Sequence, residues 1–433
     1  MTRMLIVGGR VIDPSQSLDR VTNVLIDSGR IAAYDAPAES PPDAAANGCQ
    51  VIDAAGMIVS PGLIDMHVQL REPGCEEDET IESGTAAALA GGFTSIVCTP
   101  DTEPPIDTQA SVEFVRQKAA RARHCHVFVV ACVSKNREGE ELAEIGSLVE
   151  AGAVAFSDAS RPIYNTNLLR RALEYCLMFD KPILNHPEVL ELSRGGVMHE
   201  GLISMILGLT GMPPEAEDVM TSRDLRLAES TGGRLHLMNI SSSDSVEMIR
   251  RAKARGVKVS AAVCPPHFTL TDQRLRTFDA NCKLNPPLRS QDHVDACIAG
   301  LADGTLDVIA SGHAPRAAEK KMQELDLAPF GAVNLETTLA LVITRLIEPG
   351  HLDWSDALAK MTDHPARILG LDKGTLRIGA DADVTVINPT VRWKVDPARF
   401  RSRSSNTPFA GQELVGRAEY TIVGGQVRYS WHC

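Results

Sequence analysis

The chain has 433 residues, 44% of them hydrophobic, which is enough to bury a large core and to form two structural units. Its formal net charge of -13 argues against nucleic acid or an anionic membrane as a partner, so no nucleic acid and no membrane is expected to bind. No apolar run reaches the roughly 18 residues of a membrane-spanning helix. The ten cysteines include no C-x-x-C pair, which favours reduced thiols in a cytoplasmic protein over a disulfide framework or a zinc ribbon.

The first segment of the chain, residues 3–57, alternates apolar and polar side chains between turn signals. Residues 5–7, 24–26 and 51–52 are apolar, and each run is followed within a few residues by a glycine. This pattern predicts short antiparallel strands, and it favours a strand over a signal peptide for residues 1–11. Residues 36–48, rich in Pro, Ala, Asp and Glu, are expected to form a loose surface connection.

From residue 58 to about residue 371, strand-like apolar runs alternate with helical periods. Eight runs can be counted, at residues 59–68, 95–98, 127–133, 154–156, 182–184, 235–237, 257–259 and 308–310. Helical faces lie between them, for example at residues 111–121, 168–178 and 245–254, and the tail returns to strands at 375–378, 384–386 and 420–427. The predicted fold is α/β: a TIM-type (β/α)8 barrel over residues 58–375, with a small β-sandwich formed by residues 1–57 and 376–433.

The stretch at residues 61–74 organises the rest of the chain. His67 and Gln69 lie two residues apart on the first barrel strand, so both point to the same face, into the barrel near its C-terminal mouth. This stretch resembles the first barrel strand of the dihydroorotases, in the amidohydrolase superfamily, with their pattern D-x-H-x-H-x-R-E-P-G. In this chain Gln69 stands where that pattern has its second histidine.

The resemblance implies a mouth in which two zinc ions are held by four histidines, a bridging carboxylate and an aspartate. Zinc needs three or four ligands and lowers the pKa of its bound water to about 7. Only His67 and His186 remain at the matching positions, and they belong to different zinc ions in the family arrangement. The other four positions have changed, to Gln69, Ala159, Asn239 and Gly312. Gly312, in place of the family's proton-shuttling aspartate, cannot accept a proton.

The substrate pocket implied by the resemblance has changed less. Arg71, Asn285 and the pair Phe330-Gly331 are kept, whereas Asp101 replaces a family asparagine and Arg316 replaces a family histidine. A carboxylate at position 101 is expected to repel the carboxylate of dihydroorotate, unless Arg316 pairs with one of them.

Several other residues have a structural interpretation beside the functional one. His67 and His186 are expected to be hydrogen-bonded interior histidines rather than ligands. His124-Cys125-His126 looks like a metal H-x-H, but it precedes a strand at the wrong end of a barrel and is interpreted as surface. Residues 76–79 are expected at a solvated helix start, and residues 264–267 in a rigid loop. Asp158 replaces the missing bridging ligand only if the register shifts by one residue.

The first functional hypothesis is a non-catalytic dihydroorotase homologue of the pyrimidine pathway that needs no cofactor and assembles with aspartate transcarbamoylase in a homo- or hetero-oligomer. One alternative is an active cyclic-amide hydrolase with a rearranged or single metal site, and zinc is the expected cofactor in that case. A third is a module that binds a pyrimidine intermediate, with weak affinity for dihydroorotate or carbamoyl aspartate, through Arg71 and Asn285.

Overall fold

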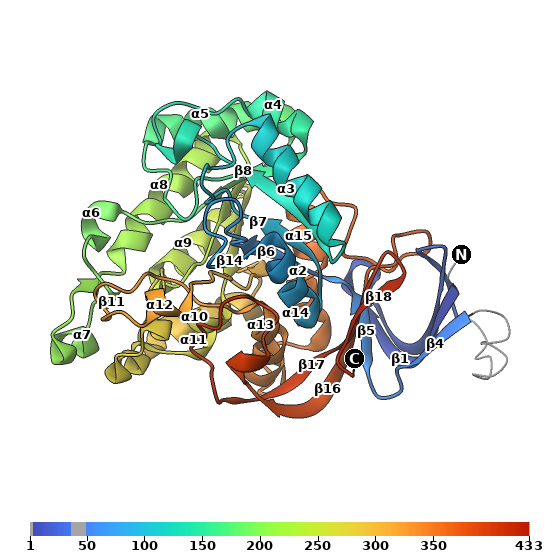
Figure 1. The fold of residues 1–433 in the computed structure, drawn as a ribbon. Helices are drawn as coiled ribbons and strands as arrows, with labels where there is room; N and C mark the ends of the chain where they lie inside the picture. The colour runs from blue at the N-terminus through green and yellow to red at the C-terminus, as the bar shows by residue number, and fades with distance from the viewer. Residues whose placement is uncertain (1–2, 36–48, 433) are drawn as a thin grey trace.

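The computed structural model describes residues 3–35 and 49–432 of the chain. The connection expected at residues 36–48 lies outside the described residues. A large α/β body and a smaller all-β part lie side by side, and strands from both ends of the chain meet in the smaller part (Figure 1).

The terminal segments form one eight-stranded sheet rather than two separate sheets, and it curls around its own core (Figure 1). Strand β5 pairs with β1 on one side and antiparallel with β16 on the other, so both chain ends share this sheet. Ile58–Pro61 therefore belongs to the terminal sheet, although residue 58 was expected to begin the barrel. The strands are β1 (Arg3–Asp13), β2 (Leu18–Asp27), β3 (Arg30–Tyr34), β4 (Cys49–Asp53), β5 (Ile58–Pro61), β16 (Val384–Lys394), β17 (Glu413–Val423) and β18 (Gln426–Ser430).

The core of this sheet joins apolar side chains that are nearly 400 residues apart in sequence, such as Met4, Ile6, Val384 and Ile422. The expected strand at residues 375–378 is absent. There, the backbone N–H of Leu376 donates to Asp13 instead of to a strand neighbour.

Eight parallel strands form the barrel, as predicted. Their order follows the chain, and the strands are short and largely buried, although the first three residues of β8 are only half-buried. The strands are β6 (Leu63–Val68), β7 (Phe93–Cys98), β8 (His126–Ala131), β9 (Ala153–Phe156), β10 (Ile183–Asn185), β13 (Leu235–Leu237), β14 (Val259–Val263) and β15 (Val308–Ile309). A further ribbon, β11 (Met198–His199) with β12 (Gly211–Met212), lies outside the barrel.

The barrel closes between its first strand and the segment that follows its last one. Val68 bridges in parallel to His313, and the backbone N–H of Gln69 donates to the carbonyl of His313 at 2.9 Å. This contact places residues 67–71 and 311–316 next to each other at the C-terminal mouth.

Helices cover the outside of the barrel (Figure 1). Several begin with a side-chain cap: Thr80 and Ser83 form a capping box at α2, and Thr108 and Ser111 form another at α3. Among the described residues, no helix combines the length and apolar character needed to cross a bilayer. The helices are α2 (Ile81–Ala90), α3 (Gln109–Ala122), α4 (Ile145–Ala151), α5 (Thr166–Cys176), α6 (Leu190–Ser193), α7 (Leu202–Leu207), α8 (Glu215–Thr231), α9 (Ser243–Ala254), α10 (Pro265–Thr269), α11 (Gln291–Ala302), α12 (Ala318–Lys321), α13 (Leu335–Val342), α14 (Trp354–Ala359) and α15 (Asp363–Leu369).

Candidate functional site

A cavity of about 290 Å³ lies at the C-terminal mouth of the barrel. All six positions that correspond to the family's metal ligands line it: His67, Gln69, Ala159, His186, Asn239 and Gly312. Four of the six predicted pocket residues line it as well, namely Asn285, Arg316, Phe330 and Gly331. The remaining two, Arg71 and Asp101, lie directly behind Gln69 and Ser160 of the cavity wall.

His67, near the end of β6, is tied to the replaced ligand position on the opposite side of the barrel. Its Nδ1 lies 2.8 Å from Oδ1 of Asn239, and the Cys264 thiol donates to the same oxygen at 3.0 Å. Because a carbonyl oxygen only accepts, Nδ1 carries the proton and Nε2 presents its lone pair. Burial lowers the pKa of His67 to about 4, so the ring is neutral at pH 7.

His186, the other remaining histidine, is engaged by a carboxylate. Its Nε2 lies 3.3 Å from Glu188, and Asn285 donates to the same Glu188 oxygen at 2.9 Å. Burial opposes ionisation of Glu188, but the hydrogen bond and the charge of His186 outweigh it and hold the pKa at about 2. Asn285, expected to bind substrate, therefore already has a partner within the chain.

Arg71 is neutralised by Asp101 rather than free to bind a substrate carboxylate. The two side chains are 5% and 7% exposed, and Arg71 Nη1 lies 3.0 Å from Asp101. Arg71 also donates to Gln69, and Ser160 bonds both Gln69 and Asp101. Burial opposes ionisation of Asp101, but the charge of Arg71 prevails and the pKa stays below its usual value.

Arg316 does not pair with Asp101, as the sequence had suggested it could. Its Nε donates to the carbonyl of Phe330 at 3.0 Å, and its Nη1 lies 3.5 Å from Asp78. Burial, followed by the nearby charge of Arg71, lowers the pKa of Arg316. The cation that limits repulsion by Asp101 is therefore Arg71.

Gly312 has little room for the aspartate that it replaces. Its backbone has φ +61°, and a Cβ added there would lie 2.6 Å from the sulfur of Cys264. The change at position 312 and the thiol at position 264 are therefore sterically linked.

The donor set of this mouth does not fit the two zinc ions of the family. Within residues 3–35 and 49–432, no group of three or more His, Cys, Asp or Glu side chains is placed to hold a metal. His186 is paired with Glu188, and the neutral amides of Gln69 and Asn239 are poor zinc ligands. Asp158 does not replace the missing bridge, because it turns away to accept from Val133, Ser134 and the Ser134 hydroxyl.

Three buried acceptors that line the cavity have no hydrogen-bond partner among residues 3–35 and 49–432: His67 Nε2, His267 Nδ1 and Asn334 Oδ1. The Nε2 of His267 bonds the carbonyl of Pro286 at 2.9 Å, so its Nδ1 is also a lone-pair acceptor. A buried acceptor without a partner costs about 1–3 kcal/mol. The cavity is therefore suited to a ligand that carries several N–H or O–H donors.

His267 and Asn334 were not among the predicted site residues. The rigid loop expected at residues 264–267 was wrong in part, because residues 265–267 begin helix α10. The expectation for residues 76–79 was wrong in part, because Asp78 and Glu79 are completely buried. Glu79 bonds His313, the backbone N–H of Arg403 and the hydroxyl of Ser402. Glu79 thereby connects the segment that follows β15 to the C-terminal part of the chain.

Comparison with known proteins agrees with this architecture. A family described as Dihydro-orotase-like matches residues 56–245, and one described as Amidohydrolase family matches residues 326–429. The L-hydantoinase (dihydropyrimidinase) of Arthrobacter aurescens has the same fold, with a TM-score of 0.87 at 24% identity over 99% of this chain and 96% of that one. This likeness confirms the barrel fold.

Two curated relatives match over nearly their whole length. A protein named dihydroorotase from Pelotomaculum thermopropionicum is 50% identical over 425 residues, which cover 98% of each chain. Another of that name, from Syntrophus aciditrophicus, is 49% identical over 427 residues, covering 99% of each chain. With this identity across its full length, the chain belongs to the dihydroorotase family of the amidohydrolase superfamily.

Proposed function

We propose that this chain is a dihydroorotase homologue of the pyrimidine pathway that has lost zinc-dependent hydrolysis and is kept as a structural partner. The observation that carries the proposal is the donor set of the barrel mouth. All six ligand positions meet around one cavity, but only His67 and His186 can coordinate zinc, and His186 is paired with Glu188.

Hydrolysis of a cyclic amide needs an activated water molecule and a group that moves its proton. Gly312 stands at the position of the family's base, and loss of a general base alone costs about 10²–10⁴ in rate. His67 is a weak substitute, because burial lowers its pKa to about 4. The mouth thus lacks both the metal donors and the base.

The cavity is still suited to binding a small molecule. Its three free acceptors match the N–H groups of a pyrimidine-pathway intermediate, and Arg316 and Phe330 form part of the wall. The Arg71–Asp101 pair leaves no net positive charge behind Gln69 for a carboxylate. Weak binding of dihydroorotate or carbamoyl aspartate is therefore expected.

A second candidate is dihydroorotase activity with a rearranged or single metal, with zinc as its cofactor. The names of the full-length relatives favour it, since both are called dihydroorotases at about half identity. The lone pairs of His67 Nε2 and His267 Nδ1 in the cavity are the imidazole donors that remain for such a site.

The proposed partner is aspartate transcarbamoylase, in the cytoplasm and in a homo- or hetero-oligomer. Such an assembly needs an intact fold and an apolar surface. The fold is complete from the terminal sheet to the barrel closure, and large exposed apolar side chains gather in residues 190–219, on α6, α7 and α8.

One experiment separates the two candidates. The purified chain, produced with zinc in the medium, is analysed for metal by mass spectrometry and assayed for interconversion of dihydroorotate and carbamoyl aspartate. The Pelotomaculum thermopropionicum relative serves as positive control. We expect substoichiometric zinc and no turnover. Stoichiometric zinc, together with turnover that disappears in His67→Ala, would establish the second candidate and overturn the first.

A further inference from the structure

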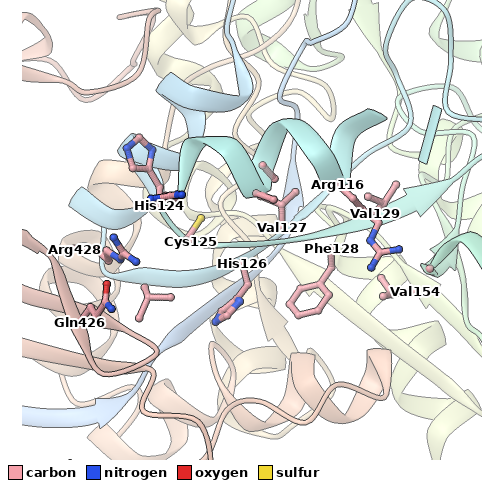
Figure 2. A pocket seen from close by; sticks show the side chains of 15 residues that line it. Arg116, His124, Cys125, His126, Val127, Phe128, Val129, Val154, Gln426 and Arg428 are labelled. Atoms are coloured by element: carbon pink, nitrogen blue, oxygen red, sulfur yellow. The ribbon is translucent and has the colours of Figure 1, made fainter. Parts of the chain in front are cut away.

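A second cavity, of about 750 Å³, opens at the opposite end of the barrel from the mouth. Its walls come from the start of β8, the end of α3, the start of β9 and the β17–β18 hairpin of the terminal sheet. The His124-Cys125-His126 stretch forms its centre (Figure 2). No step of the proposed function uses this cavity.

The charged side chains that line this cavity are all arginines. Arg116, Arg123, Arg428, His124 and His126 line it, and no Asp or Glu is among the lining residues. The whole chain has a net charge of -13, but this cavity is lined by three guanidinium groups and no carboxylate. Its local electrostatic potential is therefore positive and attracts anions.

Two of these guanidinium groups are free to bind. Within the described part of the chain, the side chains of Arg123 and Arg428 make no hydrogen bond or ion pair, and both residues are exposed. Arginine is the residue best suited to binding phosphate oxygens with two parallel hydrogen bonds. Both side chains are therefore available to a phosphate without breaking an internal contact.

The other three polar side chains of the cavity are held in place by the fold. The Nη1 of Arg116 donates to the carbonyl of Ala151 at 2.7 Å and lies over Gly152, where a Cβ would come within 2.8 Å of it. His124 Nδ1 lies 3.0 Å from the Thr85 hydroxyl. His126 contacts Asp383 at 3.0 Å, and that carboxylate is also paired with Lys373 at 2.7 Å. The carboxylate that contacts His126 is thus already paired with a lysine.

An aromatic ring lies between the polar side chains. Phe128 of β8 is half-buried, and its ring lies between His126 and Arg116 (Figure 2). His124 and Arg428 lie near each other at the left of the view, away from Phe128 and Arg116 (Figure 2). A volume of this size with an aromatic floor suits a small molecule rather than a bare ion.

We propose that this cavity binds a phosphorylated small molecule that also carries a flat, apolar portion, a nucleotide being the simplest member of that class. The phosphates contact Arg123, Arg428 and His124, and the flat portion packs against Phe128. Such a ligand connects the barrel to the β17–β18 hairpin and stabilises the folded chain.

Titration calorimetry on the full-length chain in about 150 mM salt tests the proposal, with ATP and inorganic tripolyphosphate as the two probes. We expect saturable binding of one equivalent of each, with ATP the tighter ligand. Arg123→Ala and Arg428→Ala should each weaken both ligands about tenfold, the loss of one charged hydrogen bond. Phe128→Leu, which keeps an apolar side chain, should weaken ATP but not tripolyphosphate.

The matched control is Arg171→Ala, which removes an exposed arginine of α5 outside the cavity. It changes the net charge equally and should leave both affinities intact. The proposal is overturned if neither probe binds saturably, if Arg171→Ala weakens binding as much as Arg123→Ala, or if ATP binds no tighter than tripolyphosphate and Phe128→Leu has no effect.

Discussion

At the scale of single residues, the buried pair Arg71–Asp101 sets the charge that lies behind Gln69 of the barrel mouth. Its side chains are almost completely buried, and Thr99 and Ser160 also hydrogen-bond Asp101. In the family, the corresponding arginine lies beside a neutral asparagine and is free to bind a carboxylate. In this chain it is paired with Asp101 instead. One substitution restores the family residue.

Asp101→Asn should raise the affinity for dihydroorotate and carbamoyl aspartate at least tenfold. The reason is that the positive charge of Arg71 would no longer be neutralised and could attract the carboxylate of the ligand. The unliganded variant should lose about 3 kcal/mol of unfolding free energy, since a buried cation is left without its partner. Calorimetry and urea unfolding measure the two effects. Dihydrouracil, which lacks the carboxylate, is the control ligand and should bind both proteins equally; an unchanged affinity for dihydroorotate would contradict this role of Asp101.

At the scale of the elements, residues just beyond the neighbouring strands β14 and β15 lie next to each other at the mouth. Cys264 follows β14, and Gly312 follows β15 with φ +61°. Gly312→Ala should destabilise the chain by about 2–4 kcal/mol, from positive φ and from overlap with the Cys264 sulfur. In the background of Cys264→Ala the same change should cost at least 1 kcal/mol less.

The matched control for this cycle is Gly256→Ala, also at positive φ (+82°) but with open space where its Cβ would stand. It should cost only about 1–2 kcal/mol, the steric cost of the left-handed backbone. Equal losses at positions 256 and 312 would mean that Cys264 does not limit position 312. A test that places the family aspartate at this position, Gly312→Asp, is therefore best made together with Cys264→Ala.

Helix α13 contributes a pH dependence to stability. Glu336, in its first turn, accepts from the backbone N–H groups of Arg401 and Ser402 at 2.8 and 3.1 Å. Burial raises the pKa of Glu336 from 4.5 to about 8, so the folded chain holds a proton there that the unfolded chain releases. The contribution of this group to stability is therefore lost as pH rises from about 4.5 to about 8.

Glu336→Gln keeps the acceptor oxygen and cannot titrate. Its unfolding free energy, relative to the unchanged chain, should rise between pH 5 and pH 8 in urea unfolding experiments. Glu150→Gln, at an exposed carboxylate of α4, is the control and should show no such trend. A difference that stays constant with pH for Glu336→Gln would show that this carboxyl is ionised in the folded chain.

The sequence predicted the elements better than it predicted the contacts between them. Buried parallel strands are apolar on both faces, so even β10, of three residues, and β15, of two, could be located as apolar runs. The strand expected at residues 375–378 does not form. There the backbone N–H of Leu376 donates to the side chain of Asp13, which is far away in sequence.

For the site, local motifs located all six ligand positions around one cavity, but they gave no side-chain partners. The pairing of Arg71 with Asp101, the burial of Glu79 and the free acceptor of His267 depend on residues brought together only by barrel closure. A sequence motif does not show which charged side chains, distant in sequence, form ion pairs in the folded chain.

At the scale of the whole molecule, a chain kept for assembly needs a surface that a partner can cover. Leu202 and Met205 of α7 are 67% and 74% exposed, and Ile206, Val219, Leu190 and Leu192 of the same segment are also exposed. Helices α6 and α7 lie at the edge of the molecule, away from the terminal sheet (Figure 1). Exposed apolar groups gathered in one segment mark interaction surfaces in soluble proteins.

We therefore predict that the chain and aspartate transcarbamoylase from the same cell elute together in size-exclusion chromatography at micromolar concentrations. Met205→Glu should weaken this complex at least tenfold, because a charge would be buried in an apolar interface. Ile378→Glu, at an exposed apolar residue of the terminal segment, is the control and should not weaken it. Separate elution of the unchanged proteins, with transcarbamoylase activity indifferent to this chain, would contradict the scaffold role. Loss of the complex in Ile378→Glu but not in Met205→Glu would instead assign the interface to the segment around residue 378.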